Sequence, residues 1–470
     1  MLLCRIRLKE RYKIIILVAA FIFPYAVAAQ QHFLHPSAFS TSGRINPGDT
    51  LTRKNFGRGA VLFSLVEVLP WTFDKYIKKA DYANISFKTV AHNLNPGSWA
   101  WDNDNFQTNQ FGHPYHGSHF YSAFRANGYS FWQSVPAVFA GSYIWETAAE
   151  KQYPAPNDFI NTSFGGVILG EMTYRLSNKI INNHSRGFKR QAGEVVALLI
   201  NPMNGITRIL DHKWGKVTAN SREQDSSKIY AEFDLGMRKV SPNGKDNTLK
   251  AYGHIKLLYG TPYENYKVPF SNITINTEIG QDDSSKINTI SVYGSLNGWR
   301  IRSSQNLRHL AVLSANYDYI HNQSFFYRAQ SVKFNFYSEL SVSGKIKLNT
   351  SFGAGPVILG AVPDGYTFNS RNYDYVSGIG YNAAGRLSIG GKFFYTLNYR
   401  GGWLTTINGN KSYYFLHTLS GEARYMCLNR FSICAEPGYF TLHGHYHNYA
   451  SVNKNYPYLR LSVRYSINIE

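Results

Sequence analysis

A segment of 21 residues, Trp99 to His119, concentrates side chains that could do acid–base or metal chemistry. Neighbouring carboxylates can serve as a general acid and a general base, and histidines with carboxylates can hold a divalent metal ion. The same groups can instead join two structural elements through buried hydrogen bonds. The chemistry-capable residues of the segment are Asp102, Asp104, His113, His116 and His119.

Two glutamates follow on a stretch of helical character. Glu146 and Glu150 are four residues apart, so they share one helix face. If that face meets the histidines, His116, Glu146 and Glu150 could hold a divalent metal ion, as helical carboxylate–histidine sites do. Buried His–Glu hydrogen bonds that pin two helices together are the alternative. The cluster from Asp102 to Asn105 could alternatively bind a cation such as calcium through oxygen ligands. No cofactor other than a divalent metal is expected.

A catalytic site would draw on Asp102, Asp104, His113, His116, Glu146 and Glu150. The amides and Gly97 around the two aspartates also favour a turn with local side-chain hydrogen bonds. No Gly-x-Ser-x-Gly motif, phosphate-binding loop or Cys–His pairing is present. The sequence therefore leaves open whether the protein is an enzyme.

A second set of charged residues suits a structural network. Arg125 and Arg175 occur in apolar helical surroundings, where the guanidinium fork pairs well with a carboxylate. Glu146, Glu150 and Glu171 are the candidate partners. We assign Arg125, Asp158 and Glu171 to this network.

The first part of the mature chain has helical character. We expect helices over residues 58–79 (with a kink at Pro70), 118–128, 134–151, 158–177 and 187–200, and an extended stretch over 82–94. Gly165, Gly166 and Gly170 are unfavourable in an exposed helix, so we expect them where one helix packs closely on another.

From about Trp214 the hydrophobic period becomes two. Residues 229–238, 251–257 and 459–469 alternate apolar side chains with polar or charged ones, over lengths that fit transmembrane strands. We count about twelve strands. The predicted fold class is mainly β: a transmembrane antiparallel barrel, preceded by a helical module that plugs the barrel or packs on it. A soluble β-sandwich or barrel is the alternative.

The N-terminus resembles a secretory signal peptide. Five basic residues precede the apolar run Ile14 to Phe23, which is too short to span a bilayer, and Ala26-Val27-Ala28 provides a small-residue cleavage site. We expect a signal peptide at residues 1–28, an N-terminal extension at 29–54, the helical module at 55–212 and the barrel at 213–470. The expected location is the bacterial outer membrane.

The mature chain is basic. Without residues 1–28 it has 44 Lys and Arg against 28 Asp and Glu, a net charge of +16. In an exported protein such a charge favours anionic lipid, including lipopolysaccharide, as a partner and argues against nucleic acid. The oligomeric state is not set by the sequence.

Cys427 and Cys434 would face each other across a turn at Arg430 and Phe431, and could form a disulfide.

Several of these motifs together resemble a known family. WAWDNDNF, NQFGHPYHGS, FWQS, GSYIWE, NTSFGG and GEMTYRLS, in this order, are similar to the family called domain of unknown function 3943, typical of outer-membrane-type proteins of Gram-negative bacteria. The resemblance covers about residues 84–210. The family pattern carries over at Trp101, Asp102, Asp104, Asn109, His113, Pro114, His116, Gly117, Arg125, Gly128, Glu146, Glu150, Asp158, Gly166 and Glu171.

The resemblance implies a location and an architecture but no activity. His119 stands where the family pattern tolerates other residues, and Ala155 replaces the serine that usually precedes the aspartate. Two functions remain open: an outer-membrane barrel with a structural, transport or binding role whose helices plug or cap it, and a membrane-embedded hydrolase or enzyme that modifies lipid A or phospholipid.

Overall fold

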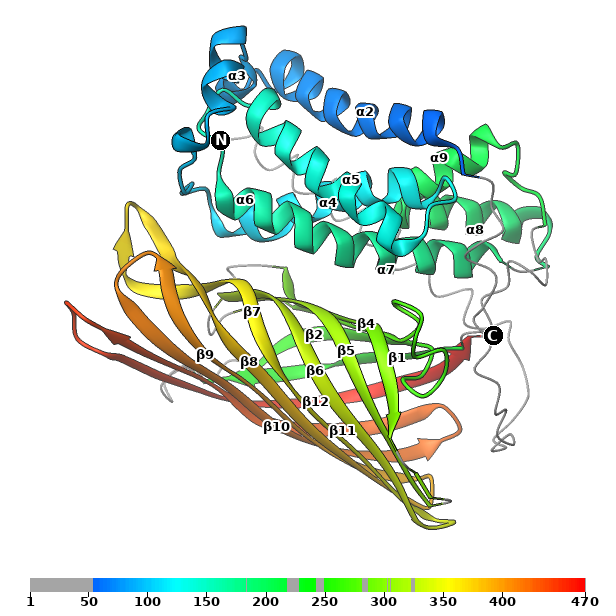
Figure 1. Cartoon of the computed structure of the whole chain (residues 1–470). Coiled ribbons are helices and arrows are strands. Elements are labelled where there is room, and N and C mark those ends of the chain that lie inside the picture. Colours follow the sequence, from blue (N-terminus) through cyan, green and yellow to red (C-terminus); the bar gives the residue numbers. More distant parts are fainter. Residues whose placement is uncertain are drawn as a thin grey trace, which may run out of the picture.

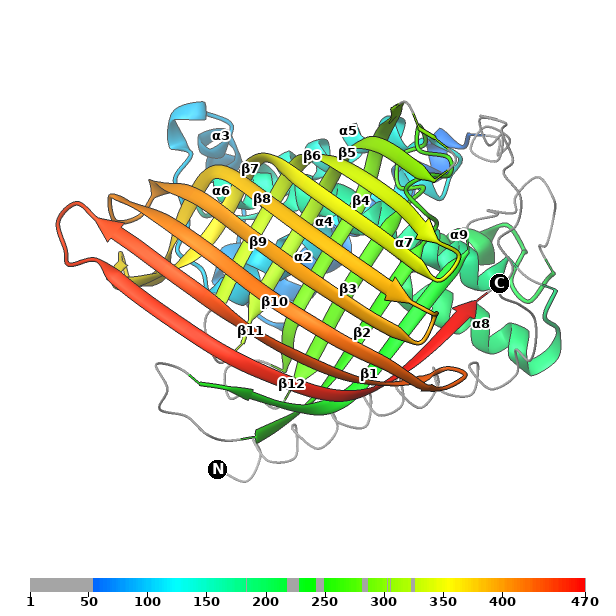
Figure 2. The same ribbon diagram turned by 90° about the horizontal axis from the view of Figure 1, so that it is seen from below.

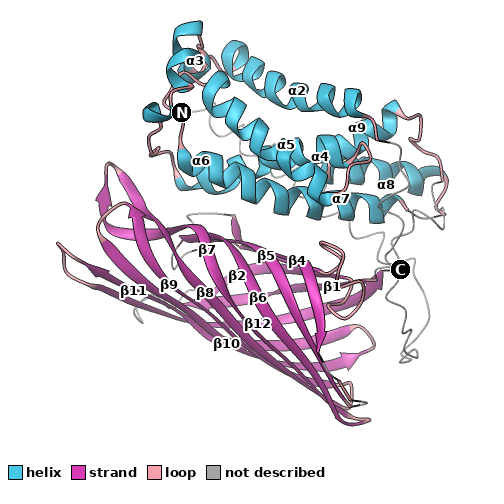
Figure 3. Ribbon diagram, in the orientation of Figure 1, coloured by secondary structure: helices cyan, strands magenta, loops and turns pink. Residues whose placement is uncertain are grey.

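The protein has two parts, a layer of helices and a closed β-barrel (Figures 1 and 3). The computed structural model describes residues 54–469 apart from 183, 218–227, 242–248, 281–285, 302, 305 and 323–325. We call residues 54–217 the helical module and residues 228–469 the barrel. The expected signal peptide and the N-terminal extension, except for Lys54, lie outside the described residues.

The helical module contains both α-helices and short 3-10 or π segments. Its elements are α2 (Phe56–Thr72), η3 (Phe73–Ile77), η4 (Asp81–Ala83), α3 (Phe87–Asn93), η5 (Pro96–Ser98), η6 (Thr108–Gly112), α4 (His113–Arg125), α5 (Phe131–Ile144), η7 (Trp145–Ala149), α6 (Pro156–Ile160), η8 (Asn161–Gly165), α7 (Gly166–Ile181), α8 (Gly187–Ile200) and α9 (Pro202–Leu210).

One local prediction was wrong. Residues 82–94 are not extended but contain η4 and α3. The signal for α3 is a capping box: the Ser86 hydroxyl accepts from the Thr89 amide and the Thr89 hydroxyl accepts from the Ser86 amide.

The helices pack closely around α4. A Cβ atom on Gly166 would lie 2.7 Å from Gly117 Cα, and one on Gly170 would lie 2.7 Å from the Tyr121 ring. Both glycines of α7 are therefore needed for contact with α4, as the sequence predicted. Val66 of α2 contacts His116 of α4. Figure 1 shows α2 on the side of the helical layer that faces away from the barrel.

The barrel has twelve strands, as predicted, and every neighbouring pair is antiparallel. The strands are β1 (Ile229–Val240), β2 (Leu249–Tyr259), β3 (Ile273–Gly280), β4 (Ile287–Ile301), β5 (Leu307–His321), β6 (Phe326–Ser343), β7 (Ile346–Phe368), β8 (Arg371–Ile389), β9 (Phe393–Asn408), β10 (Ser412–Leu428), β11 (Phe431–Tyr446) and β12 (Val452–Ile469). Pairing of β1 with β12 closes the sheet and leaves it without an edge.

The two faces of the wall differ in chemistry. Charged side chains of non-neighbouring strands meet on the inner face: Arg464 of β12 binds Glu422 of β10 at 2.6 Å, and Arg424 of β10 binds Glu232 of β1 at 2.7 Å. The outer face carries exposed apolar side chains, among them Leu235 on β1. A polar interior inside an apolar outer surface is typical of outer-membrane barrels.

Apolar side chains line the interior near the hairpins that join β5 to β6, β7 to β8 and β9 to β10. This apolar layer consists of Ala329, Val357, Val362, Val376, Leu404, Tyr414, Leu416 and Leu442, all buried. Its members come from β6 through β11, six neighbouring strands that form one continuous arc of the wall. Four residues before Leu404 on β9, the Arg400 guanidinium donates to the Ser291 hydroxyl of β4 at 3.2 Å.

The predicted disulfide is wrong: Cys427 and Cys434 are free thiols, the first exposed and the second buried. Leu428 pairs with Phe431, so the turn begins one residue earlier than the turn assumed at Arg430 and Phe431. A register shift beside Leu428 then takes Cys427 out of line with Cys434.

Among the helices in the described part of the chain, none has both the length and the apolar character to cross a membrane.

We predict that Arg464→Gln destabilises the barrel by about 3 kcal/mol, because Asp234 and Glu422 would lose a buried cationic partner. Thermal unfolding of the detergent-solubilised protein, followed by the gel shift between folded and unfolded barrel, measures the effect. Lys345→Gln, in the exposed β6–β7 turn, is the control and should leave the midpoint unchanged. Equal midpoints for Arg464→Gln and the control would contradict the prediction.

Candidate functional site

The segment from Trp99 to His119 lies between the helical module and the barrel. Its first residues form a loop, and η6 and the start of α4 follow. The Trp101 ring lies 5.1 Å from the Tyr375 ring of β8, and the Phe106 ring lies 4.8 Å from the Phe326 ring of β6. The most informative segment of the sequence is therefore the contact between the two parts of the protein.

Asp102 is the centre of a hydrogen-bond cluster within the module. Its Oδ1 accepts from Asn109 Nδ2 at 2.5 Å, from Asn157 Nδ2 at 3.2 Å and from the Asp104 amide at 3.2 Å. Asn109 and Asn157 also donate to the Tyr375 hydroxyl, at 2.8 and 2.9 Å. The cluster thus connects three segments of the module to β8.

Arg371, the first residue of β8, holds the loop from the barrel side. Its guanidinium donates to the Asp102 carbonyl at 3.1 Å and to Asn408 Oδ1 at 2.7 Å. The same group lies 4.4 Å from the centre of the Tyr375 ring. The Tyr373 hydroxyl donates to the Asp104 carbonyl at 2.9 Å.

A second polar contact joins η8 to β6. Arg328 is fully buried and donates to Asn161 Oδ1, and Gln330 Nε2 donates to the Asn161 carbonyl at 3.1 Å. On β5, the Tyr317 hydroxyl donates to the Gln110 carbonyl at 2.6 Å.

These contacts lie on the outer face of the barrel. The register of β6 against β5 is regular, so Arg328 and Gln330 share a face with Phe334 and Phe336, which are 53% and 38% exposed. Figure 2 shows the barrel from the side away from the helices, with the helices behind its wall. Of the two placements expected, packing on the barrel is correct. The contacts of the described residues give no support to a helical plug.

His113 and Asp158 meet beside this cluster, with His113 Nε2 3.5 Å from Asp158 Oδ1. Burial lowers the pKa of His113 to about 4 and raises the pKa of Asp158 above its usual range. Burial therefore favours the neutral form of both side chains. Asp104 is more exposed, and partial desolvation together with the nearby Asp102 charge raises its pKa.

His116 does not face the glutamates, so the proposed metal group does not form. His116 Nε2 lies 3.1 Å from the Val66 carbonyl oxygen and its ring packs 4.6 Å from the Trp145 ring. Glu146 Oε2 accepts from the Ala155 amide at 2.8 Å, and Glu150 Oε1 accepts from Trp145 Nε1 at 2.8 Å. In the described residues, no three His, Cys, Asp or Glu side chains gather as a metal-binding group.

The expected His–Glu staple is also replaced by other contacts. His119 packs its ring 4.7 Å from the Tyr115 ring, on the same helix. The connection between the module and the barrel is made by amide, tyrosine and arginine side chains instead.

The Arg125 network forms as predicted, with Glu171 as its centre. Arg125 Nε donates to Glu171 Oε2 at 2.8 Å, and Arg175 Nε donates to Glu171 Oε1 at 2.7 Å. The Tyr121 hydroxyl adds a third bond at 2.8 Å. Glu171 is fully buried, and these three donors compensate the removal of its charge from water. Asp158 belongs to the His113 contact and not to this network.

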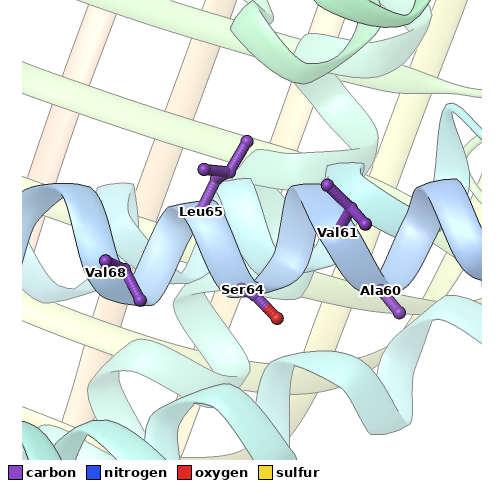
Figure 4. Close-up of a pocket in the computed structure, with 5 residues that line it drawn as sticks. All are labelled: Ala60, Val61, Ser64, Leu65 and Val68. Carbon is purple, nitrogen blue, oxygen red and sulfur yellow. The ribbon is translucent and has the colours of Figure 1, made fainter.

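The geometry provides no catalytic arrangement for the candidate residues. Asp102 and His113 are occupied by neighbours inside a packed interface, and a shallow surface depression on α2 contains neither of them (Figure 4). The depression is lined by Ala60, Val61, Ser64, Leu65 and Val68. The segment therefore serves as a docking element, and the enzyme alternative is not supported.

The sequence did not reveal the barrel residues of this interface: Tyr317, Arg328, Gln330, Arg371, Tyr373 and Tyr375. On a strand of period two, Arg328 and Gln330 fall on the apolar face that includes Phe334. Polar residues at lipid-facing positions were the signal that could have identified them.

We predict that Glu150→Gln makes the stability of the protein less sensitive to a rise in pH from 5 to 7. Burial raises the pKa of Glu150 to about 7, above its unfolded value, so its contribution is complete below the unfolded pKa and is lost as pH rises through 7. Glutamine keeps an acceptor for Trp145 Nε1. Unfolding midpoints measured from pH 5 to pH 9 should show the wild type losing up to about 3 kcal/mol relative to the variant. A constant difference across this range would contradict the prediction.

Solved structures that resemble the chain are outer-membrane proteins, and the likeness covers about half of it. The KdgM porin is 10% identical, with 50% of this chain and 99% of that chain covered and a TM-score of 0.26. An outer membrane channel from Pseudomonas putida F1 is 10% identical, with 52% and 95% covered and a TM-score of 0.30. The channel DcaP of Acinetobacter baumannii is 8% identical, with 51% and 96% covered and a TM-score of 0.24.

No curated protein matches the sequence. A family model does match within the helical module, and it includes the docking segment and the Arg125–Glu171 network. Residues 98–203 match the family described as Domain of unknown function (DUF3943), the family that the sequence motifs resemble.

Proposed function

We propose that the protein is a resident of the Gram-negative outer membrane, exported with a cleaved signal peptide at residues 1–28, in which the barrel is a scaffold that holds the helical module against its outer wall. The protein then has a structural or lipid-binding role and is not a channel for the free diffusion of solutes. The observation that carries this proposal is the burial of Arg328 and Gln330, two polar residues of the outer wall, beneath Asn161 of the module.

A charged or amide side chain that faced lipid hydrocarbon would cost several kcal/mol. The barrel wall at β6 is therefore suited to the module and unsuited to lipid. The scaffold function follows from this, because each part covers a surface that the other cannot leave exposed.

The interior of the barrel supports a closed state. The apolar layer, with Leu404 and Tyr414 among its members, is buried and draws on six strands. Tyr414 is fixed by a hydrogen bond of 2.7 Å to Asp374. Arg400 keeps 52% of its side chain exposed, so the interior is more open away from this layer. An apolar constriction at this layer would block ions by excluding water.

Anionic lipid is the partner that the charge of the chain supports. The mature chain has a net charge of +16, and phospholipid or lipopolysaccharide supplies the phosphate groups that lysine and arginine bind. No cofactor enters this proposal.

We predict that the full chain, inserted in planar lipid bilayers, gives no steady conductance. The double variant Leu404→Ala/Tyr414→Ala should conduct, because it removes two large side chains from the apolar layer. Vesicle flotation must first confirm that both proteins insert. Steady ohmic channels from the wild type would contradict the closed state.

A further inference from the structure

An apolar stripe runs along the side of α2 and η3 that faces away from α4. The residues recur every three or four positions, as one face of a helix requires. They are Val61, Leu65, Val68, Leu69, Phe73 and Ile77, and each is at least 40% exposed. Three of them line the shallow depression in Figure 4. A water-soluble helix would place polar side chains on this face.

The module reaches from one end of the barrel to the other. Arg175 of α7 donates to the Pro269 carbonyl at 2.8 Å, in the β2–β3 connection, which lies at the end where β1 begins. Asp102 contacts Arg371 at the β7–β8 hairpin, which lies at the opposite end because successive strands alternate in direction. The helices therefore flank the wall over its whole height, and membrane lipid surrounds that height in an inserted barrel.

α2 and η3 run along the same height of the barrel wall. α2 is antiparallel to α4, since Phe56 packs on Phe124 and Val66 on His116. The 17 residues of α2 and the five of η3 have a combined length of about 33 Å. The hydrocarbon core of a bilayer is about 30 Å thick. Only the outer side of this helix must be apolar, because α4 covers its other side.

Lysine–aromatic pairs mark both ends of the stripe. Lys75 lies 4.7 Å from the centre of the Trp71 ring and 5.7 Å from that of Tyr76. At the other end, Lys54 lies 5.8 Å from the centre of the Tyr129 ring. Lysine and aromatic side chains are enriched at membrane interfaces, where the ring is half-immersed and the ammonium group meets lipid phosphate.

The outer face of the barrel has the same apolar character. Leu235 on β1 and Val463 on β12 are 69% and 54% exposed and point outward. Lipid that surrounds the barrel would meet apolar side chains both on these strands and on the stripe.

We propose that the helical module lies within the bilayer beside the barrel, and that the stripe on α2 and η3 contacts lipid acyl chains while the lysines at its two ends bind anionic headgroups. This inference rests on the proposed membrane residence of the barrel and adds the contact surface and its ligand.

Quenching by brominated lipid tests it. Single cysteines are introduced into the full chain with Cys427→Ser and Cys434→Ser, labelled with bimane and reconstituted in phosphatidylcholine vesicles with or without bromine on the acyl chains. Val68→Cys probes the stripe, Leu235→Cys probes the barrel wall, and Lys345→Cys in the exposed β6–β7 turn is the control. Leu69→Cys, 60% exposed, is a second probe of the stripe in case the first does not fold.

We expect quenching at Val68 to match that at Leu235 within about twofold, and quenching at Lys345 to be several-fold weaker. Quenching at Leu235 with none at Val68 and Leu69 beyond that at Lys345 would overturn the inference and leave the membrane barrel in place. Absence of quenching at Leu235 would overturn the proposed membrane residence itself, and the inference with it.

Discussion

The buried polar contact between Arg328 and Gln330 of β6 and Asn161 of η8 is the constraint on which the arrangement of the two parts depends. These β6 side chains point outward, in register with the exposed Phe334. Lipid offers them no hydrogen-bond acceptor, whereas the amide and carbonyl oxygens of Asn161 accept one hydrogen bond from each. The barrel wall therefore specifies a helical partner at this place.

Two consequences follow from the placement outside the wall. The interior is left to the barrel's own side chains, which form the apolar layer and the ion pairs around Arg464. The helices become part of the outer surface, so their exposed faces must suit whatever surrounds the barrel. The apolar stripe on α2 and the apolar side chains of β1 meet that requirement in the same way.

The elements of the fold were predictable because their signals are local. The period of two predicted about twelve strands, and the apolar setting of Arg125 predicted a carboxylate partner, for which Glu171 was one of three candidates. The prediction failed for α3, where the capping box at Ser86 outweighed an extended pattern. It also failed for the disulfide, because the position of a turn shifts by one residue without changing the pattern of the strands.

The sequence predicted where the polar cluster lies, but it did not predict which residues its side chains contact. The segment from Trp99 does form a polar cluster, yet Asp102 meets Asn109 and Asn157, and the barrel supplies Tyr375 and Arg371. The two barrel partners lie more than 200 residues from the module residues that they bind. No local sequence pattern could have identified a contact between residues so far apart. Glu146 and Glu150 have the spacing of a metal site, but the π segment η7 and the loop after it direct them to Ala155 and Trp145.

Site-directed disulfide formation tests most directly whether the module docks on the outer wall. In the Cys427→Ser/Cys434→Ser chain, Asn161→Cys is paired with Gln330→Cys, which faces outward, or with Ser331→Cys, the next residue, which faces the interior. In intact membranes under mild oxidation, outer-wall docking predicts a cross-link for the pair 161 and 330 and none for the pair 161 and 331. A cross-link only for 161 and 331 would place the helices inside the barrel and contradict this account.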